Sequence, residues 1–303
     1  MLIGTDGYGD GCYNDNMLAG IVSFCEAHPQ VRLTLEQPTS IADAGKRLDA
    51  WLADEKPVER AMILASNSYE GILKGKSAPK NGRVLILETD DLFPGHSSYI
   101  IRRYGASWLC GAMSKEYDPI ILKAMDGNDM IDESARGYTE GFRTVSDRPL
   151  FSWTVADGPE GFSMRDSVYR FVYNHVYDEV YSQPQIGTLL FFPLLGGSLP
   201  GVFDYGRYNG FINIVGMDTD CSAYNPYMVP FSLTLSNDRA LKHYLEDWLA
   251  GTPWPEHTVF GMESNYVQVV INSKYNMVGD DFQARYQEFY SQAIEKEEAY
   301  EVE

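Results

Sequence analysis

The chain has 303 residues, is 44% hydrophobic and carries a formal net charge of −19. A chain of this length is too long for one ordinary core and predicts two lobes or domains. The acidic charge argues against nucleic acid or an anionic membrane surface as a partner, because both require clustered Lys and Arg. No apolar run approaches the roughly 18 residues that span a bilayer.

Strand-like runs alternate with helical patterns along the chain. Several runs are continuously apolar, as expected for strands that are buried on both faces. The runs cover residues 31–35, 61–64, 84–87, 99–101, 120–124, 151–155, 188–192, 212–217 and 267–271. This alternation predicts an α/β fold with mostly parallel strands, and the number of runs favours two sheets.

Apolar residues at helical spacing predict helices between the strands. One follows Asn14-Asp15, a second follows Ser40 as N-cap, a third begins at Asp166, and a fourth begins at Asn237 or Asp238. Irregular stretches at 88–96 and 220–230 interrupt the alternation. The acidic tail over residues 293–303 is expected to be a fraying helix or disordered.

A glycine-rich turn, GTDGYGDGCYND, stands between the first apolar residues and the first helix. Its spacing is not G-x-G-x-x-G, and Asp10 would repel a pyrophosphate, so a dinucleotide site is disfavoured. Open α/β sheets bind ligands where strands end and helices begin. Tyr13 could stack on a flat ring there and Asn14 could pair with its polar edge. The alternative is that Asn14 or Asp15 only caps the helix.

Three strands in the second half of the chain end in polar or glycine turns. The turns carry Asp126, then Leu195 with Gly196 and Gly197, then Asp218. Each turn alone is explained by solvation of a carboxylate or by a tight turn. Together they predict a ligand site along one edge of a parallel sheet.

Catalytic and metal-binding signatures are missing from the sequence. It has no G-x-S-x-G and no H-E-x-x-H, and none of its five histidines follows a predicted strand. Its four cysteines form no C-x-x-C pair and have no histidine at metal-ligand spacing. We therefore expect a protein that is not an enzyme and that has no metal and no cofactor.

Several motifs occur in the same order as in the basic membrane lipoprotein (BMP) family, which includes purine nucleoside receptors. GDGCYNDNMLAG resembles the G-D-x-S-F-N opening of that family, and RYGASWLCG, from Arg103 to Gly111, resembles its E-G-x-x-x-G helix start after a strand. AMD with ARGYTEGF, GGS and VGMDTD are similar to the later motifs. The resemblance covers roughly residues 9–272.

The resemblance implies a type I periplasmic-binding-protein fold, with two Rossmann-like α/β lobes joined by a multi-strand hinge. Lobe 1 would comprise residues 1–115 plus about 236–272, and lobe 2 residues 116–235 plus about 273–303. It further implies a monomeric substrate-binding protein that captures a nucleoside for the permease of an ABC-type importer. Such a protein would be periplasmic or at the cell surface, held by a lipid on a segment that is absent from this chain.

The resemblance also implies the roles of individual residues. Tyr13 takes the place of the family's stacking Phe, Asn14 matches the residue that meets the base, and Asp218 matches the acid that accepts the ribose hydroxyls. The remaining predicted ligand-binding residues lie in the matched turns: Asp10, Asp126, Leu195, Gly196 and Gly197. The chain departs from the family pattern at Leu235, where a Lys is usual.

Two other functions remain open at this stage. A ligand-sensing module of the same fold would bind the same molecule without transport, and its gene neighbours or a fused output domain would reveal it. A nucleoside- or sugar-processing enzyme would use Asp126 or Asp218 as a base, and turnover by the purified chain would reveal it.

Overall fold

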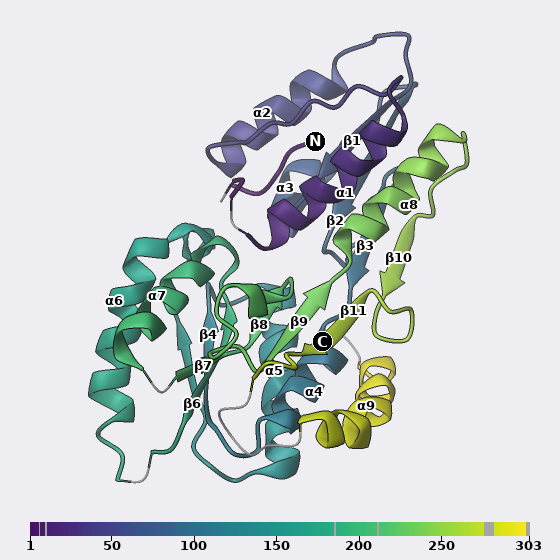
Figure 1. The fold of residues 1–303 in the computed structure, drawn as a ribbon. Helices are drawn as coiled ribbons and strands as arrows, with labels where there is room; N and C mark the ends of the chain where they lie inside the picture. Colours follow the sequence, from purple (N-terminus) through teal and green to yellow (C-terminus); the bar gives the residue numbers. More distant parts are fainter. Residues whose placement is uncertain (6, 10, 185, 211, 276–281, 301–303) are drawn as a thin grey trace. The chain divides into compact units, whose positions relative to one another are not determined.

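The computed structural model describes residues 1–303 except 6, 10, 185, 211, 276–281 and 301–303 (Figure 1). The chain divides into two compact units. Unit 1 comprises Met1–Ile101 and Ser236–Phe260, and unit 2 comprises Arg102–Leu235 and Gly261–Glu303. The chain therefore passes from one unit to the other three times.

Unit 1 is built on a parallel sheet. The strands are ordered β1 (Arg60–Leu64), β2 (Gly82–Leu87), β3 (Ser97–Ile101) and β10 (His257–Phe260). Every paired neighbour runs parallel. Leu2 forms an isolated parallel bridge with Leu64, so the first residues of the chain run beside β1. The continuously apolar runs of the sequence are explained by burial of this sheet on both faces.

Helices cover the sheet of unit 1 (Figure 1). They are α1 (Tyr13–Ala27), α2 (Ile41–Leu52), α3 (Glu70–Leu73) and α8 (Asn237–Leu249). Leu48 of α2 and Leu73 of α3 belong to one buried cluster with Leu64 and Ile86 of the strands. Ser40 caps α2 as predicted, because its Oγ accepts the Asp43 N–H at 3.1 Å.

Unit 2 holds a second parallel sheet. Its strands are ordered β5 (Phe151–Thr154), β4 (Asp118–Lys123), β6 (Leu189–Leu194) and β7 (Ile212–Ile214). The helices of this unit are α4 (Tyr104–Met113), α5 (Asp129–Val145), α6 (Arg165–His175), α7 (Leu199–Asn209) and α9 (Phe282–Glu298). Helix α4 packs against both α5 and α9.

A third sheet also belongs to unit 2. It contains β8 (Gly216–Asp218), β9 (Phe231–Leu235) and β11 (Val267–Ile271), with β8 parallel and β11 antiparallel to β9. The single strand predicted over 212–217 is therefore wrong. The chain changes sheets at Val215, whose N–H is donated to Phe191 O at 2.8 Å, and β8 then pairs with β9.

Three other predictions are corrected by the structure. Residues 31–35 form no strand, because the pairing in that stretch is limited to a bridge between Glu36 and Leu2. Strand β10 was not predicted, since Val259 and Phe260 are its only apolar residues. The tail is helical as far as Glu298 and is anchored by Ala293, which is fully buried.

The division into units differs from the predicted lobe boundaries at residues 115 and 272. Residues 102–115 lie in unit 2, where α4 packs on α5 and α9. Residues 261–272 also lie in unit 2, because β11 pairs with β9. Helix contacts and strand pairing in the tertiary structure thus decide these boundaries.

The contact between α4 and α5 depends on glycine. A Cβ on Gly111 would lie 2.1 Å from Tyr138 O, and a Cβ on Gly141 would lie 1.9 Å from Trp108 O. Real Cβ atoms cannot approach a carbonyl oxygen so closely. The two helix backbones therefore lie nearer to each other than side chains at these positions would allow.

We expect Gly111→Ala to lower the free energy of unfolding by about 1–3 kcal/mol, because the added methyl group forces α4 and α5 apart. Thermal and urea unfolding followed by circular dichroism measures this. Gly71→Ala in α3 is the matched control, since nothing lies within 4 Å of a Cβ there. A Gly111→Ala protein as stable as the Gly71→Ala protein would contradict the close packing.

Candidate functional site

Loops gather at the carboxyl edge of the unit 1 sheet. Leu2 is bridged to Leu64, and Leu64 pairs with Ile86, so the chain leaves the sheet at one edge after each of these residues. The glycine turn follows Leu2, Ser66 and Asn67 follow β1, and Glu88 and Thr89 follow β2. Parallel α/β sheets bind ligands at this edge.

The glycine turn is folded back onto the start of α1. Gly7, Gly9 and Gly11 have φ angles of 81°, 79° and 65°, which residues with a side chain rarely adopt. The two carboxylate oxygens of Asp15 accept the N–H groups of Gly9 at 2.9 Å and Gly11 at 2.8 Å. Asp15 therefore fixes the shape of the turn.

The predicted residues of unit 1 have different surroundings. Tyr13 is the first residue of α1 and is partly exposed. Asn14 is fully buried, and its Oδ1 accepts the Gly4 N–H at 3.2 Å. Asn14 thus joins the end of the first strand-like segment to α1. Asp10 lies outside the described residues.

Unit 2 has a second gathering of turns at a carboxyl edge. Lys123, the last residue of β4, pairs with Thr154 of β5 and with Leu194 of β6. Asp126 follows β4, and the glycines at 196 and 197 follow β6. The register therefore brings Asp126, Thr154 and the 196–197 turn to one edge of the sheet, as the sequence predicted for Asp126 and the glycines.

Asp126 is held as an anion by two neighbours that sequence reasoning missed. Lys123 Nζ pairs with its carboxylate, and Thr154 Oγ1 donates to Asp126 Oδ1 at 3.0 Å. The hydrogen bond from Lys123, followed by that from Thr154, lowers the pKa of Asp126. Lys123 also lies 3.6 Å from Asp132, so the cation is shared between two carboxylates. A lysine at the end of an apolar strand is the sequence signal that could have indicated this arrangement.

The turn after β6 presents backbone to its surroundings. Leu195 is fully buried, so its side chain belongs to the core, and Gly196 has a φ angle of 49°. Ser198 Oγ donates to Gly161 O at 2.7 Å and accepts the Met164 N–H at 2.6 Å. These bonds tie the turn to the neighbouring loop and fix its position.

Asp218 ends a strand of the other sheet in unit 2. It pairs with Thr234 of β9, and its φ angle of 65° is unusual for a residue with a side chain. Strand β8 belongs to a different sheet from β4, which precedes Asp126, although β8 also lies against β6. Leu235, at the position where the family has Lys, is 4% exposed and belongs to the core.

Within the described part of the chain, no group of three or more His, Cys, Asp and Glu side chains is placed to hold a metal ion. Burial raises the pKa of the Cys221 thiol to about 11, which keeps it protonated near neutral pH. A search of the same residues for a helix long and apolar enough to cross a membrane found none.

Comparison with known proteins identifies the fold. No family model and no curated protein matches the sequence. The solved structures include an ABC transporter solute-binding protein from Aeropyrum pernix K1, with a TM-score of 0.73 and 13% identity over 98% of this chain and 89% of that chain. A transcriptional activator of the comK gene from Bacillus halodurans has a TM-score of 0.68 and 12% identity over 97% of this chain and 96% of that chain. This chain has the α/β fold of periplasmic binding proteins and LacI-like regulators.

A third solved structure shares this fold. It is GanP, a glucose-galactose binding protein from Geobacillus stearothermophilus, with a TM-score of 0.60 and 14% identity over 89% of this chain and 96% of that chain. The α/β fold class agrees with the sequence prediction, whereas the described residues form three sheets and not the two that the sequence favoured. The roles that the resemblance implies for Tyr13 and Asp218 stay predictions.

We expect Asp15→Ala to raise hydrogen exchange at the Gly9 and Gly11 amides tenfold or more, because both N–H groups lose a charged acceptor. Amide exchange measured by mass spectrometry of overlapping peptides tests this. Asp43→Ala is the matched control, since Asp43 accepts the Thr39 N–H ahead of α2. Unchanged exchange in the glycine turn of the Asp15→Ala protein would show that Asp15 does not fix it.

Proposed function

We propose that this protein is an extracytoplasmic solute-binding protein that captures a small molecule and delivers it to an ABC-type importer. One observation carries the proposal: the likeness to a solute-binding protein extends over 98% of this chain, and thus over all three passages between the units. In such a fold, ligand binding is coupled to movement of one unit relative to the other. The strand-end turns of each unit are the candidate ligand contacts of that unit.

The proposed ligand is a nucleoside. Support comes from the BMP-like order of motifs, from the partly exposed Tyr13 ring and from the ionised Asp126. Stacking of a base on an aromatic ring contributes about 1–3 kcal/mol. A hydrogen bond from a sugar hydroxyl to a carboxylate contributes roughly 1.5–3 kcal/mol. The ionised carboxylate of Asp126 would repel a phosphate group.

Ligand sensing without transport is the second candidate. It is favoured by the likeness to a transcriptional activator and to a LacI-family repressor from Corynebacterium glutamicum, which has a TM-score of 0.58. Both candidates require a bound small molecule and differ in the protein that receives the signal or the solute. We propose that the chain is not an enzyme, and the absence of nucleoside turnover would support this.

Native mass spectrometry of the purified chain tests the proposed ligand. We expect a complex with adenosine at lower ligand concentration than with adenosine monophosphate, because the carboxylates repel the phosphate. Galactose serves as a third ligand, since GanP is described as binding it. Equal or tighter binding of the monophosphate would refute the nucleoside proposal, and preferred binding of galactose would replace it. A chain that binds none of the three and carries no copurified molecule would contradict solute binding.

We expect Tyr13→Leu to weaken adenosine binding tenfold or more, since leucine keeps apolar bulk but cannot stack as a flat ring. Calorimetric titration measures the affinity, and the melting temperature of the free protein should change by only a few degrees. Tyr208→Leu is the matched control, because Tyr208 on α7 is 79% exposed and lies outside the strand-end turns. An affinity equal to that of the control would exclude Tyr13 from the site.

A further inference from the structure

The chain passes between the units at three segments, and two of these segments contact the side chain of Glu297. The first crossing segment, residues 102–105, starts α4, and the third crossing segment, residues 261–262, starts the last part of unit 2. Glu297 on α9 accepts the Gly105 N–H at its Oε2, at 3.1 Å, and the Met262 N–H at its Oε1, at 2.6 Å. One carboxylate therefore holds both crossing segments.

Each of the two segments has a glycine where Glu297 approaches it. A Cβ on Gly261 would lie 2.2 Å from Glu297 Oε1, and a Cβ on Gly105 would lie 2.7 Å from the Glu297 Cβ and 2.5 Å from Ala293 O. Any side chain at either position would displace the carboxylate or helix α9. Glycine at both positions thus permits the double contact.

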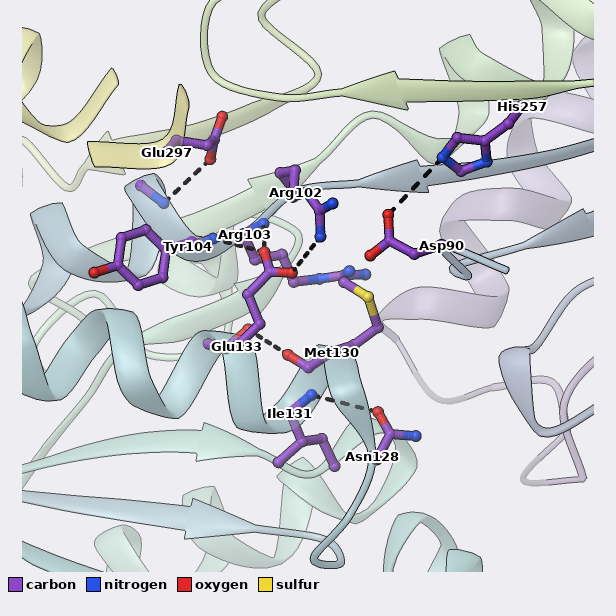
Figure 2. A network of polar contacts seen from close by, with 12 residues as sticks. Asp90, Arg102, Arg103, Tyr104, Asn128, Met130, Ile131, Glu133, His257 and Glu297 are labelled. Atoms are coloured by element: carbon purple, nitrogen blue, oxygen red, sulfur yellow. Dashed lines mark hydrogen bonds and ion pairs between the residues drawn. The ribbon is translucent and has the colours of Figure 1, made fainter. Parts of the chain in front are cut away.

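A second carboxylate completes the start of α4. Glu133 of α5 is 3% exposed, and its Oε1 accepts the N–H groups of Arg103 at 2.6 Å and Tyr104 at 2.8 Å. Its Oε2 accepts from Arg102 at 3.2 Å. Figure 2 shows Glu133 and Glu297 both turned towards the start of α4. The amides of the first turn, which have no acceptor within the helix, and the positive end of the helix favour negative charge at this place.

The surroundings make ionisation of Glu297 costly. The pKa of Glu297 is raised to about 7, chiefly by burial and to a smaller extent by the negative charge of Glu133, although the two amides and Arg102 act in the opposite direction. On the remaining sides, Tyr104 donates to Glu140, which also pairs with Arg136, and the Tyr104 ring stacks on Tyr300 at 4.4 Å. Lys296 is a further charged group near this site, and its positive charge lowers the pKa of Glu140.

Protonation changes what the group can hold. A carboxylate accepts hydrogen bonds on both oxygens, whereas a carboxylic acid carries an O–H donor on one of them. With a proton on either oxygen, one of the two N–H groups faces a hydroxyl oxygen, which is a weaker acceptor than a carboxylate oxygen. The ionised form binds Gly105 and Met262 more strongly, because both of its oxygens then share the negative charge.

We propose that Glu297 is a proton-operated clasp, which as a carboxylate holds the first and third crossing segments together and as a carboxylic acid releases one of them. The clasp acts on the chain segments that lead into unit 2 and does not depend on the identity of a ligand. The mobility of these two segments, at which the chain passes between the units, would therefore depend on pH near neutrality.

The effect on stability has a definite sign. The folded-state pKa of Glu297 lies above the ordinary value of 4.5, so the folded chain binds this proton more tightly than the unfolded chain. The contribution of Glu297 to the free energy of unfolding is fully present below pH 4.5 and is lost as the pH rises through about 7. The carboxylate therefore holds both segments at high pH, where its contribution to the free energy of unfolding has been lost.

Amide NMR of the full-length, deuterated chain between pH 5 and 9 tests the clasp. We expect the Gly105 and Met262 amide protons to shift together with a common midpoint near pH 7, and one of the two amides to exchange at least tenfold faster below it, after correction for intrinsic exchange. In Glu297→Gln both shifts should be independent of pH, because the amide side chain cannot ionise. Glu295→Gln, an exposed position on the same helix, should titrate as the unchanged chain does.

The results that overturn the clasp are equally specific. Absence of a shared midpoint in the unchanged chain excludes it, and this measurement stands even if Glu297→Gln does not fold. A titration that persists in Glu297→Gln assigns the proton to another group and also excludes the clasp. None of these outcomes depends on solute binding, so the proposed function can fail while the clasp holds.

Discussion

Close contact between helix backbones is the constraint on which the second unit depends. Helix α4 approaches α5 through Gly111 and Gly141 and approaches α9 through Gly105, at distances that a Cβ would not allow. Because the backbones lie so close, carboxylates from α5 and α9 accept the amide N–H groups at the start of α4. The same contact places residues 102–115 in unit 2 and so determines where the chain passes between the units.

One strand-end turn in each unit is fixed by a carboxylate that binds groups of the protein itself. Asp15 binds two amides of the glycine turn, and Asp126 binds Lys123 and Thr154. The turn after β6 is held instead by the Ser198 hydroxyl. Turns that are fixed in this way need less ordering when a ligand binds.

Local patterns predicted those parts of the fold that local forces determine. Ser40 caps α2, the continuously apolar runs became buried parallel strands, and the glycines at 7, 9 and 11 adopt positive φ angles in a turn. The predictions failed where pairing between distant segments decides the outcome. Residues 31–35 have strand-like composition but no partner strand within the described chain, and β10 lacks an apolar run but pairs with β3.

The sequence by itself determined the α/β class, the alternation of strands and helices and the presence of ligand-type turns at strand ends, because periodicity and turn chemistry act over a few residues. Only the tertiary structure decided that residues 212–217 serve two sheets, that Lys123 and Thr154 surround Asp126, and that Glu297 holds two segments far from it along the chain. Apart from Lys123, which lies three residues before Asp126, these features bring together residues that are remote in sequence. The energies that select them are packing and desolvation energies, which a linear pattern does not contain.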